Sequence, residues 1–517
     1  MISRNYDVVI IGAGLAGLTV GALLSSEEQK KVLVLEKEDF LGGRLASFVG
    51  EGDHLLIQGK KLTPEDFKKV LGSVYTWVCR TEPDLNSMFE RKLLDGYTFE
   101  AGGHATFWGN RGRLSHLLDY LGKHLDMPGN EGFCVIDPET KKLYPLQRGG
   151  KYGWMSEESN RIAKTLLREM ITASDEDLAE WDKISFGKWM KDRTKDRKVY
   201  EYLAAIASIH MVMGEPDMIP AGDFIRFMRT AVRIGMNLIT GSTGIIPKPG
   251  FVRVAERIAE KIEESGGNII TGTRVTEVLF EGKKVKGVKA ETASGEETFI
   301  ADQVVCTVPI NKVWSFLPKR LFPKEFVKKV DEEFSSIGML TGYVGLTRNV
   351  FADAGIHPKS WLLVPAVIKA EEGYIGDVDI ISIMPSNFAP SLAPEGKYTL
   401  GFSIALTGKE LRNKAKVDRV IDVSRELFHT VFPTMAEATE FELWTCSDQG
   451  FGVWPPPGEE RPDTTMYEFD GLYFAGDCYG AKTWGSGMDA AVFSALLCVD
   501  AITGKNYVEK ILPEYHR

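Results

Sequence analysis

Residues 6–17, YDVVIIGAGLAG, decide the fold of this chain. They begin with a mostly apolar run, which is typical of a strand buried on both faces. Gly12, Gly14 and Gly17 then form a GxGxxG pattern, and an apolar helix is expected over 15–24. In such a pattern the first glycine allows a tight turn, the second leaves room for a pyrophosphate, and the third lets the helix pack on the strand. The stretch therefore predicts a phosphate site at a helix N-terminus, where unpaired N–H groups face the ligand.

The next apolar run, over 31–36, completes this unit and ends in an acid. Glu36 stands 19 residues after Gly17, where its carboxylate can accept hydrogen bonds from an adenosine ribose. Gly42-Gly43-Arg44 lies shortly beyond it. A guanidinium beside bare backbone suits a second approach to the pyrophosphate. Together these segments predict a βαβ unit that binds a dinucleotide.

The 517 residues are too many for one small core, so two domains or more are expected. Residues 113–235 have a mostly helical pattern, with helices expected over 113–125, 157–171 and 199–211. Later segments read as α/β over 251–310, as strands and turns over 335–405, and as strand, glycine-rich turn and helix over 471–517. The dinucleotide-binding pattern thus occurs at both ends and in the middle of the chain.

Composition and charge narrow the function classes. Apolar residues make up 44% and charged residues 26%, which is ordinary for a soluble globular protein. The net charge of −10 disfavours nucleic acid as a partner, because its backbone attracts basic surfaces. The six cysteines form no CxxC pair and no Cys/His cluster, which predicts free thiols and no metal site. Residues 8–26 carry no charge but hold four glycines, so they are interpreted as buried strand, turn and helix. We predict a cytoplasmic protein, with peripheral membrane contact as the alternative.

Several of these segments resemble the flavin amine oxidase and phytoene desaturase superfamily. The resemblance includes the acid and Gly-Gly-Arg after the βαβ unit, and extends to the sequences FEAGGH at 99–104, TRVTEV at 273–278 and VVCTVP at 304–309. The most specific matches are GLYFAGD at 471–477 and MDAAV at 488–492. In the family, the last acid of the former binds the ribityl chain of FAD, and the latter begins a helix that faces the flavin ring. Only one GxGxxG is evident, so no second nicotinamide unit is expected.

The resemblance implies an α/β fold with a discontinuous FAD-binding Rossmann-like (GR2-type) domain and a mixed α+β substrate domain. We expect the first domain over 1–112, 236–310 and 461–517, and the second over 113–235 and 311–460. The implied cofactor contacts are Gly12, Gly14, Leu15, Ala16, Gly17, Glu36, Lys37, Gly43, Arg44, Gly102, Gly103, His104, Val275, Gly476, Asp477, Gly487 and Met488.

Catalytic residues are less well marked than the cofactor site. In amine oxidases of this family two aromatic side chains form a cage before the flavin; Phe451 matches one of them, but Gly487 stands at the other position. The cysteine that binds flavin covalently in some members matches Gly450, so FAD is expected to be non-covalent. Arg348 falls near the family lysine that holds a water by flavin N5, with an exposed surface arginine as the alternative. His104 either faces substrate or has a structural role.

These observations predict an FAD-dependent oxidoreductase that desaturates or saturates C–C bonds of a largely apolar, isoprenoid-like or lipid-like substrate. The missing half of the cage favours this hypothesis over its first rival, an amine or amino-acid oxidase. The second rival is a non-catalytic prenyl carrier of the Rab GDP-dissociation inhibitor type, which shares the fold but binds no flavin. The sequence leaves oxygen, a quinone or another carrier open as electron acceptor.

Overall fold

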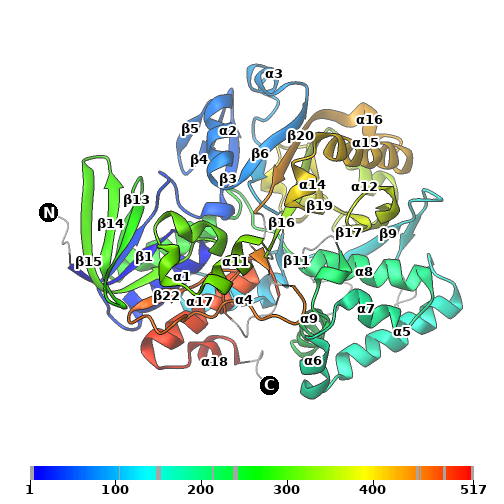
Figure 1. The fold of residues 1–517 in the computed structure, drawn as a ribbon. Coiled ribbons are helices and arrows are strands. Elements are labelled where there is room, and N and C mark those ends of the chain that lie inside the picture. Colours follow the sequence, from blue (N-terminus) through cyan, green and yellow to red (C-terminus); the bar gives the residue numbers. More distant parts are fainter. Residues whose placement is uncertain are drawn as a thin grey trace.

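The computed structural model describes residues 5–103, 105–146, 153–211, 215–236, 243–332, 334–449, 453–454, 456–480 and 485–513. Figure 1 shows a seven-stranded sheet on the left, here called the cofactor sheet because it contains the predicted βαβ unit, and a nine-stranded sheet with its helices on the right. The two are joined by several crossings of the chain, so each is built from segments that are distant in the sequence.

The predicted βαβ unit forms the centre of a seven-stranded sheet. The strand order is β12-β2-β1-β15-β14-β13, and β22 also pairs with β15. β1, β2, β12 and β22 run parallel to their neighbours, as a crossover fold requires. The strands are β1 (Asn5–Ile11), β2 (Val32–Leu35), β12 (Asn268–Ile270), β13 (Arg274–Glu281), β14 (Lys284–Thr292), β15 (Gly295–Cys306) and β22 (Leu472–Phe474).

Three long helices pack together beside this sheet. Helix α1 (Leu15–Ser26) contacts both α10 (Val252–Glu264) and α17 (Gly487–Thr503). Nearly every residue of α1 is buried, because it lies between the sheet and these two helices. The predicted strand 6–11, helix 15–24 and strand 31–36 are therefore confirmed to within a residue or two at most boundaries.

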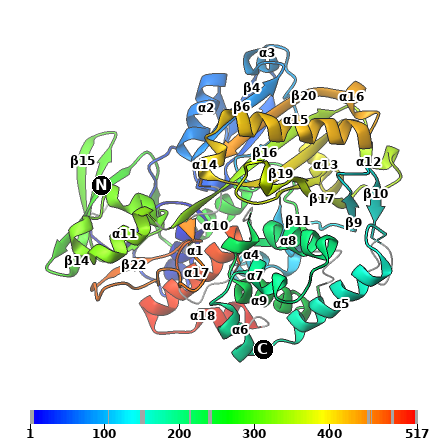
Figure 2. The ribbon, with the colours of Figure 1, turned by 45° about the vertical axis from the view of Figure 1, so that its right-hand side comes forward.

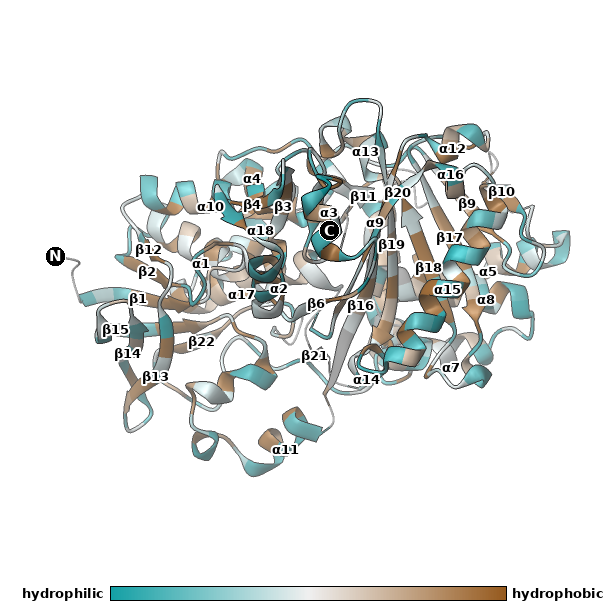
Figure 3. Cartoon of the chain, turned by 90° about the horizontal axis from the view of Figure 1, so that it is seen from above, coloured by the Kyte–Doolittle hydropathy of each residue, from teal (hydrophilic) through white to brown (hydrophobic). Residues whose placement is uncertain are grey.

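The second large sheet has nine strands and is mainly antiparallel. Its order is β10-β9-β17-β18-β19-β16-β20-β6, and β21 also pairs with β16. Apolar residues are concentrated along β17 and β18 (Figure 3). The strands are β6 (Thr76–Glu82), β9 (Gly132–Ile136), β10 (Leu143–Pro145), β16 (Ser335–Leu346), β17 (Ser360–Ile368), β18 (Val378–Ile383), β19 (Tyr398–Thr407), β20 (Thr439–Ser447) and β21 (Val453–Trp454).

Helices cover both faces of this sheet (Figure 2). On one face α15 (Lys414–Val431) shares a core with β17 and β19. On the other face lies a helical layer that shares its core with Trp361, Leu363 and Ile383. That layer consists of α5 (Glu157–Thr172), α6 (Asp175–Trp181), α7 (Phe186–Lys191), α8 (Arg197–Met211) and α9 (Ala221–Arg233).

Smaller elements complete the fold. A four-stranded sheet, ordered β5-β4-β3-β7, carries α2 and α3, and a two-stranded sheet pairs β11 with β8. The remaining bounds are β3 (Ser47–Glu51), β4 (His54–Ile57), β5 (Lys60–Leu62), β7 (Thr98–Glu100), β8 (Thr106–Phe107), β11 (Thr243–Gly244), α2 (Pro64–Ser73), α3 (Leu85–Glu90), α4 (Arg113–Tyr120), α11 (Lys324–Glu332), α12 (Val350–Asp353), α13 (Pro385–Phe388), α14 (Gly408–Leu411), α16 (Met435–Ala438) and α18 (Tyr507–Ile511).

Two segments lie in a different layer from the one that the sequence predicted. β6, expected in the cofactor part, pairs with β20 in the nine-stranded sheet. Residues 311–332, expected in the substrate part, pack against the cofactor sheet through Val313, Phe316 and Phe322. The position of β6 and of residues 311–332 depends on long-range packing, which their local sequence does not encode.

The helix predicted over 113–125 ends early, because Gly122 adopts a φ of +69° two residues after α4 ends.

Candidate cofactor and substrate site

The carboxyl ends of β1 and β15 open onto two adjoining cavities. The outer cavity lies beside β2, Glu36 and Val275, and the central cavity lies beside α17. Gly14, Arg44 and Thr307 line both, so the two cavities join into one elongated groove. In open α/β sheets this crevice beyond the carboxyl ends of the strands is where ligands bind.

The glycine turn brings α1 close to the end of β1 and leaves its backbone open to the groove. Gly12 has a φ of +106°, a left-handed conformation that favours glycine. A Cβ on Gly17 would lie 2.1 Å from the Gly12 carbonyl oxygen, so only glycine lets α1 approach the turn this closely. A Cβ on Gly14 would meet nothing within 4 Å, because this position faces the groove. Gly17 therefore shapes the turn without lining the groove, whereas Gly14 lines it directly.

Glu36 joins the turn to the outer cavity. Its carboxylate accepts hydrogen bonds from the backbone N–H groups of Ala13 (2.8 Å) and Glu38 (3.0 Å). Burial raises the pKa of Glu36, although both donors favour its charged form. Lys37 and Val275 line the same cavity. The acid thus both holds the glycine turn and presents oxygen acceptors to the outer cavity.

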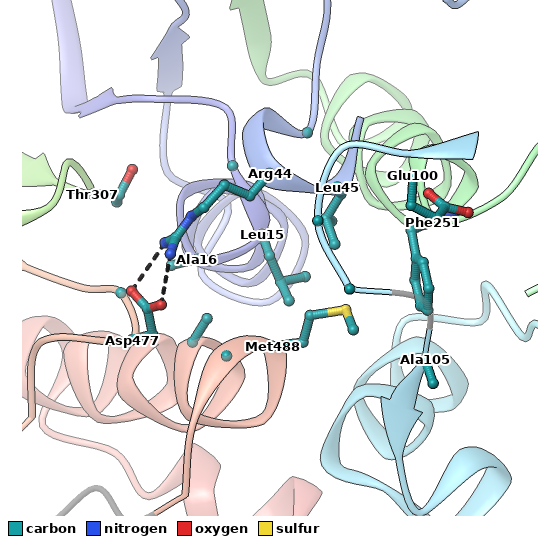
Figure 4. Close-up of a pocket in the computed structure, with 17 residues that line it drawn as sticks. Leu15, Ala16, Arg44, Leu45, Glu100, Ala105, Phe251, Thr307, Asp477 and Met488 are labelled. Atoms are coloured by element: carbon teal, nitrogen blue, oxygen red, sulfur yellow. Dashed lines mark hydrogen bonds and ion pairs between the residues drawn. The ribbon is translucent and has the colours of Figure 1, made fainter. Parts of the chain in front are cut away.

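Arg44 and Asp477 meet across the groove from opposite ends of the chain. Two guanidinium nitrogens of Arg44 donate to the two carboxylate oxygens of Asp477, at 2.8 and 3.0 Å (Figure 4). Burial opposes the charge on Arg44, but Asp477 outweighs it, so the pKa of Arg44 is raised. The bidentate pair fixes the orientation of both side chains at the junction of the two cavities.

The central cavity ends at the N-terminus of α17. Gly102 and Gly103 form one wall, while Gly476, Gly487 and Met488 form the opposite one. Leu15 and Leu45 also line this cavity (Figure 4). Gly487 has a φ of +55°, which explains glycine at this position. The first N–H groups of α17 make this end of the cavity electropositive.

Glu100 lies at the far end of the central cavity (Figure 4). Its carboxyl group accepts hydrogen bonds from the Ser47 hydroxyl and from the backbone N–H of Phe251 (3.3 Å), which precedes α10. Removal from bulk water raises the pKa of Glu100 to about 8. A carboxyl group with these partners holds the residue before α10 to the strand that precedes the Gly102-Gly103 wall.

We expect Glu100→Gln to change how the stability of the apoprotein depends on pH. Between the unfolded pKa of 4.5 and the folded value of about 8, the folded protein keeps a proton that the unfolded chain has lost. Wild-type stability should therefore fall by up to about 1.4 kcal/mol per pH unit across this window, and the variant should lack this loss. Urea unfolding at pH 5 and pH 8 measures the difference, with exposed Glu65→Gln as control. Parallel pH profiles for wild type and Glu100→Gln would contradict the assignment.

A third cavity, here called the sheet cavity, separates the central cavity from the nine-stranded sheet. Gly103, Ala105, Gly487 and Met488 line both cavities. Its remaining lining residues are Thr106, Phe107, Met339, Trp361, Ile381, Ile383, Gly401, Ser403 and Asp489. Most of them are apolar, which suits an apolar ligand.

Asp489 is the one ionisable side chain among the described residues that line the sheet cavity. It lies 3.1 Å from a guanidinium nitrogen of Arg113, and the two side chains are 4% and 0% exposed. Burial raises the pKa of Asp489, while Arg113 lowers it. The sheet cavity therefore offers a substrate no unpaired charge on its described wall.

The structure brings most of the predicted cofactor residues together. All those in the described ranges line the groove except Gly17. His104 and Phe451 lie outside the described residues. The structure corrects the prediction that Arg348 is catalytic. Its side chain is 56% exposed, forms a salt bridge with Asp353 at 3.1 Å and lines none of the three cavities. It follows β16 in a surface turn, which the loose match to the family lysine did not reveal.

Sequence reasoning missed several residues of the site, among them Thr307, Glu100 and Phe251, which line the groove, and Arg461, which lies behind it. Thr307 lies where β15 ends beside β1 and donates a 2.8 Å hydrogen bond to the Ile11 carbonyl. Its place at the carboxyl end of a strand next to β1 was a signal that could have found it. Glu100 had a local signal, because it lies two residues before Gly102 in the segment 99–104 that resembles the family. Phe251 and Arg461 carry no comparable signal, because they reach the site through tertiary packing.

Comparison with known proteins agrees with this geometry. A sequence family described as flavin containing amine oxidoreductase matches residues 87–503, and an NAD(P)-binding Rossmann-like domain matches 10–59. A chloroplastic prolycopene isomerase from Arabidopsis thaliana is 21% identical over 98% of this chain and 84% of its own length.

Many solved structures share the fold. An oxidoreductase from Methanosarcina mazei has a TM-score of 0.67 at 18% identity, covering 96% of this chain and 100% of its own. Putrescine oxidase bound to putrescine has a TM-score of 0.62 at 15% identity, covering 97% of this chain and 99% of its own. At these identities the likeness establishes only the fold, so the substrate has to be inferred from the residues of the site.

Proposed function

Since the chain belongs to the flavin containing amine oxidoreductase family and is a flavin-dependent oxidoreductase, we propose that it binds FAD non-covalently and oxidises or reduces C–C bonds of a largely apolar substrate. The substrate class would be isoprenoid-like or lipid-like. The observation that carries this proposal is the sheet cavity, which meets the groove at Gly103, Gly487 and Met488 and has mainly apolar walls.

The residues that line the groove suit the chemistry of FAD. Glu36 would accept hydrogen bonds from the adenosine ribose, and the glycine turn with α1 would hold the pyrophosphate. Arg44 would add a positive charge there, and Asp477 would bind the ribityl chain. The N-terminus of α17 would face the flavin ring. Bound FAD would supply the hydride chemistry at N5.

The protein's own contribution would be to position the substrate and exclude water. Trp361, Ile381 and Ile383 come from the nine-stranded sheet and would press an apolar chain toward the central cavity. Burial of such a chain is favourable in proportion to the apolar area removed from water. The relative named prolycopene isomerase supports an isoprenoid as the ligand. We propose a cytoplasmic protein, with peripheral membrane contact as the alternative, whose electron acceptor is oxygen, a quinone or another carrier.

The second candidate function is amine oxidation, which the structural likeness to putrescine oxidase favours. Gly487 speaks against it, since the position has no side chain with which to cage an amine. To decide, the flavin spectrum of the purified protein would be followed anaerobically while amines and then apolar polyenes are added. Bleaching by a polyene alone supports the proposal; bleaching by amines alone overturns it.

Ser403→Asp is expected to lower kcat/KM for an apolar polyene by at least about tenfold, or about 1.4 kcal/mol. Ser403 lines the sheet cavity, and a carboxylate there would be desolvated by an apolar substrate. Steady-state kinetics measures the loss, and Ser403→Ala, which introduces no charge, should stay within about twofold of wild type. Unchanged polyene turnover in Ser403→Asp would place the substrate elsewhere.

A further inference from the structure

Arg461 lies directly behind the wall of the central cavity. One guanidinium nitrogen donates to the Gly485 carbonyl at 2.7 Å, and another donates to the Asp477 carbonyl at 3.3 Å. Asp477 and Gly487 both line the cavity, so the guanidinium braces the backbone before and after this part of the wall. The Arg461 side chain is only 4% exposed, so its charge acts through protein rather than through bulk water.

The acid facing Arg461 comes from a distant part of the chain. Asp223 lies in the first turn of α9, in the helical layer beside the nine-stranded sheet, and its carboxylate is 3.5 Å from the guanidinium. The next arginine on α9, Arg226, bonds Asp182 with two contacts of 2.6 Å. Asp223 is therefore the carboxylate through which α9 reaches the backbone that forms the cavity wall.

We propose that Arg461 and Asp223 form a positioning pair that sets the reduction potential of the flavin. Arg461 holds the wall in place and supplies positive charge beside the electropositive N-terminus of α17, which favours the reduced state because that state carries added electrons. Asp223 offsets this charge when it is ionised. The inference rests on the proposed function only in requiring that a flavin occupies the central cavity.

The charges around the pair make the effect of Asp223 depend on pH. Desolvation raises the pKa of Asp223 to about 6. Arg461, Arg226 on α9 and Arg113 at the start of α4 lower it, while Asp182 after α6 raises it. Asp477 and Cys478 also interact electrostatically with Arg461. Asp223 is therefore ionised at pH 8 and protonated at pH 5, so it offsets Arg461 only at the higher pH.

The test measures the midpoint potential of the bound flavin in wild type and Asp223→Asn at pH 5 and pH 8. At pH 8 the variant should have the higher potential, by about a tenfold change in the oxidation equilibrium, which is about 30 mV for a two-electron couple. At pH 5 the two potentials should coincide. Asp175→Asn removes the 83%-exposed partner of Arg229 on the same helix and should change neither value.

A second comparison separates charge from a simple structural role. In an Arg461→Gln background, Asp223→Asn should change the potential much less, because without Arg461 the Asp223 carboxyl keeps its proton at higher pH. Asp223→Ser provides a second neutral variant if Asp223→Asn folds poorly. A shift of equal size at both pH values, a lower potential, or no shift at pH 8 would overturn the proposal, as would loss of flavin from both variants. A wild-type protein that takes up no flavin would instead refute the proposed function.

Discussion

Gly14→Val is expected to abolish flavin binding while leaving the fold of the apoprotein intact. Gly14 lines both the outer and the central cavity, and a Cβ added there meets no atom within 4 Å. Its φ of −76° and ψ of 177° are also open to valine. The branched side chain would therefore extend into the groove where a pyrophosphate would approach the backbone. We expect flavin affinity to fall at least about a hundredfold, or about 2.7 kcal/mol.

Fluorescence titration of the apoprotein with FAD measures this loss, and thermal unfolding of the apoprotein checks the fold. Gly17→Ala is the contrasting variant, because its Cβ would lie 2.1 Å from the Gly12 carbonyl oxygen and would force α1 away from β1. That variant should lose stability as well as flavin. Tight FAD binding by Gly14→Val would show that the groove does not hold the cofactor.

The second large effect is expected at the buried ion pair between Arg113 and Asp489. Arg113→Met should lower the free energy of unfolding by about 3–5 kcal/mol, because it leaves Asp489 desolvated without a partner. Arg113 is fully buried, and its guanidinium also stacks 4.3 Å from the centre of the Phe493 ring on α17. The pair joins the start of α4 to the first turn of α17, so its loss should loosen the wall of both the central and the sheet cavity.

Denaturant unfolding of Arg113→Met, Asp489→Leu and the double variant tests this expectation. The double variant should recover much of the stability lost in either single variant, because no charge is then left buried alone. Arg161→Met is a suitable control, since Arg161 and its partner Glu158 are both largely exposed and an exposed pair contributes little. Additive losses in the double variant would contradict an energetic coupling between the two side chains.

The accuracy with which the sequence predicts the structure differs from one element to another. The stretch 6–36 predicted strand, turn and helix correctly, because each property is local: apolar runs, glycines and a terminal acid lie in one short segment. Gly476 and Asp477, which line the central cavity, were predicted from the resemblance of residues 471–477 to the family. β6 was assigned to the wrong layer, because a strand's partner depends on residues hundreds of positions away.

Arg348 shows the limit of matching by position alone. The residue stands near the family lysine in the sequence, yet β16 ends before it and the turn directs it to the surface beside Asp353. Arg461 shows the opposite case: nothing in its neighbourhood marks it, but folding buries it between Asp223 and the backbone of Asp477 and Gly485.

The sequence by itself determined the βαβ unit, and it predicted the order of the cofactor segments and a dinucleotide site at Glu36, Arg44 and the glycine turn, because short-range patterns encode them. Only the tertiary structure decided which residues face one another: the Arg44–Asp477 bridge, the Arg461–Asp223 pair and the apolar sheet cavity beside α17. The physical reason is that these contacts join segments far apart in the chain, and packing of two sheets and their helices sets their distances.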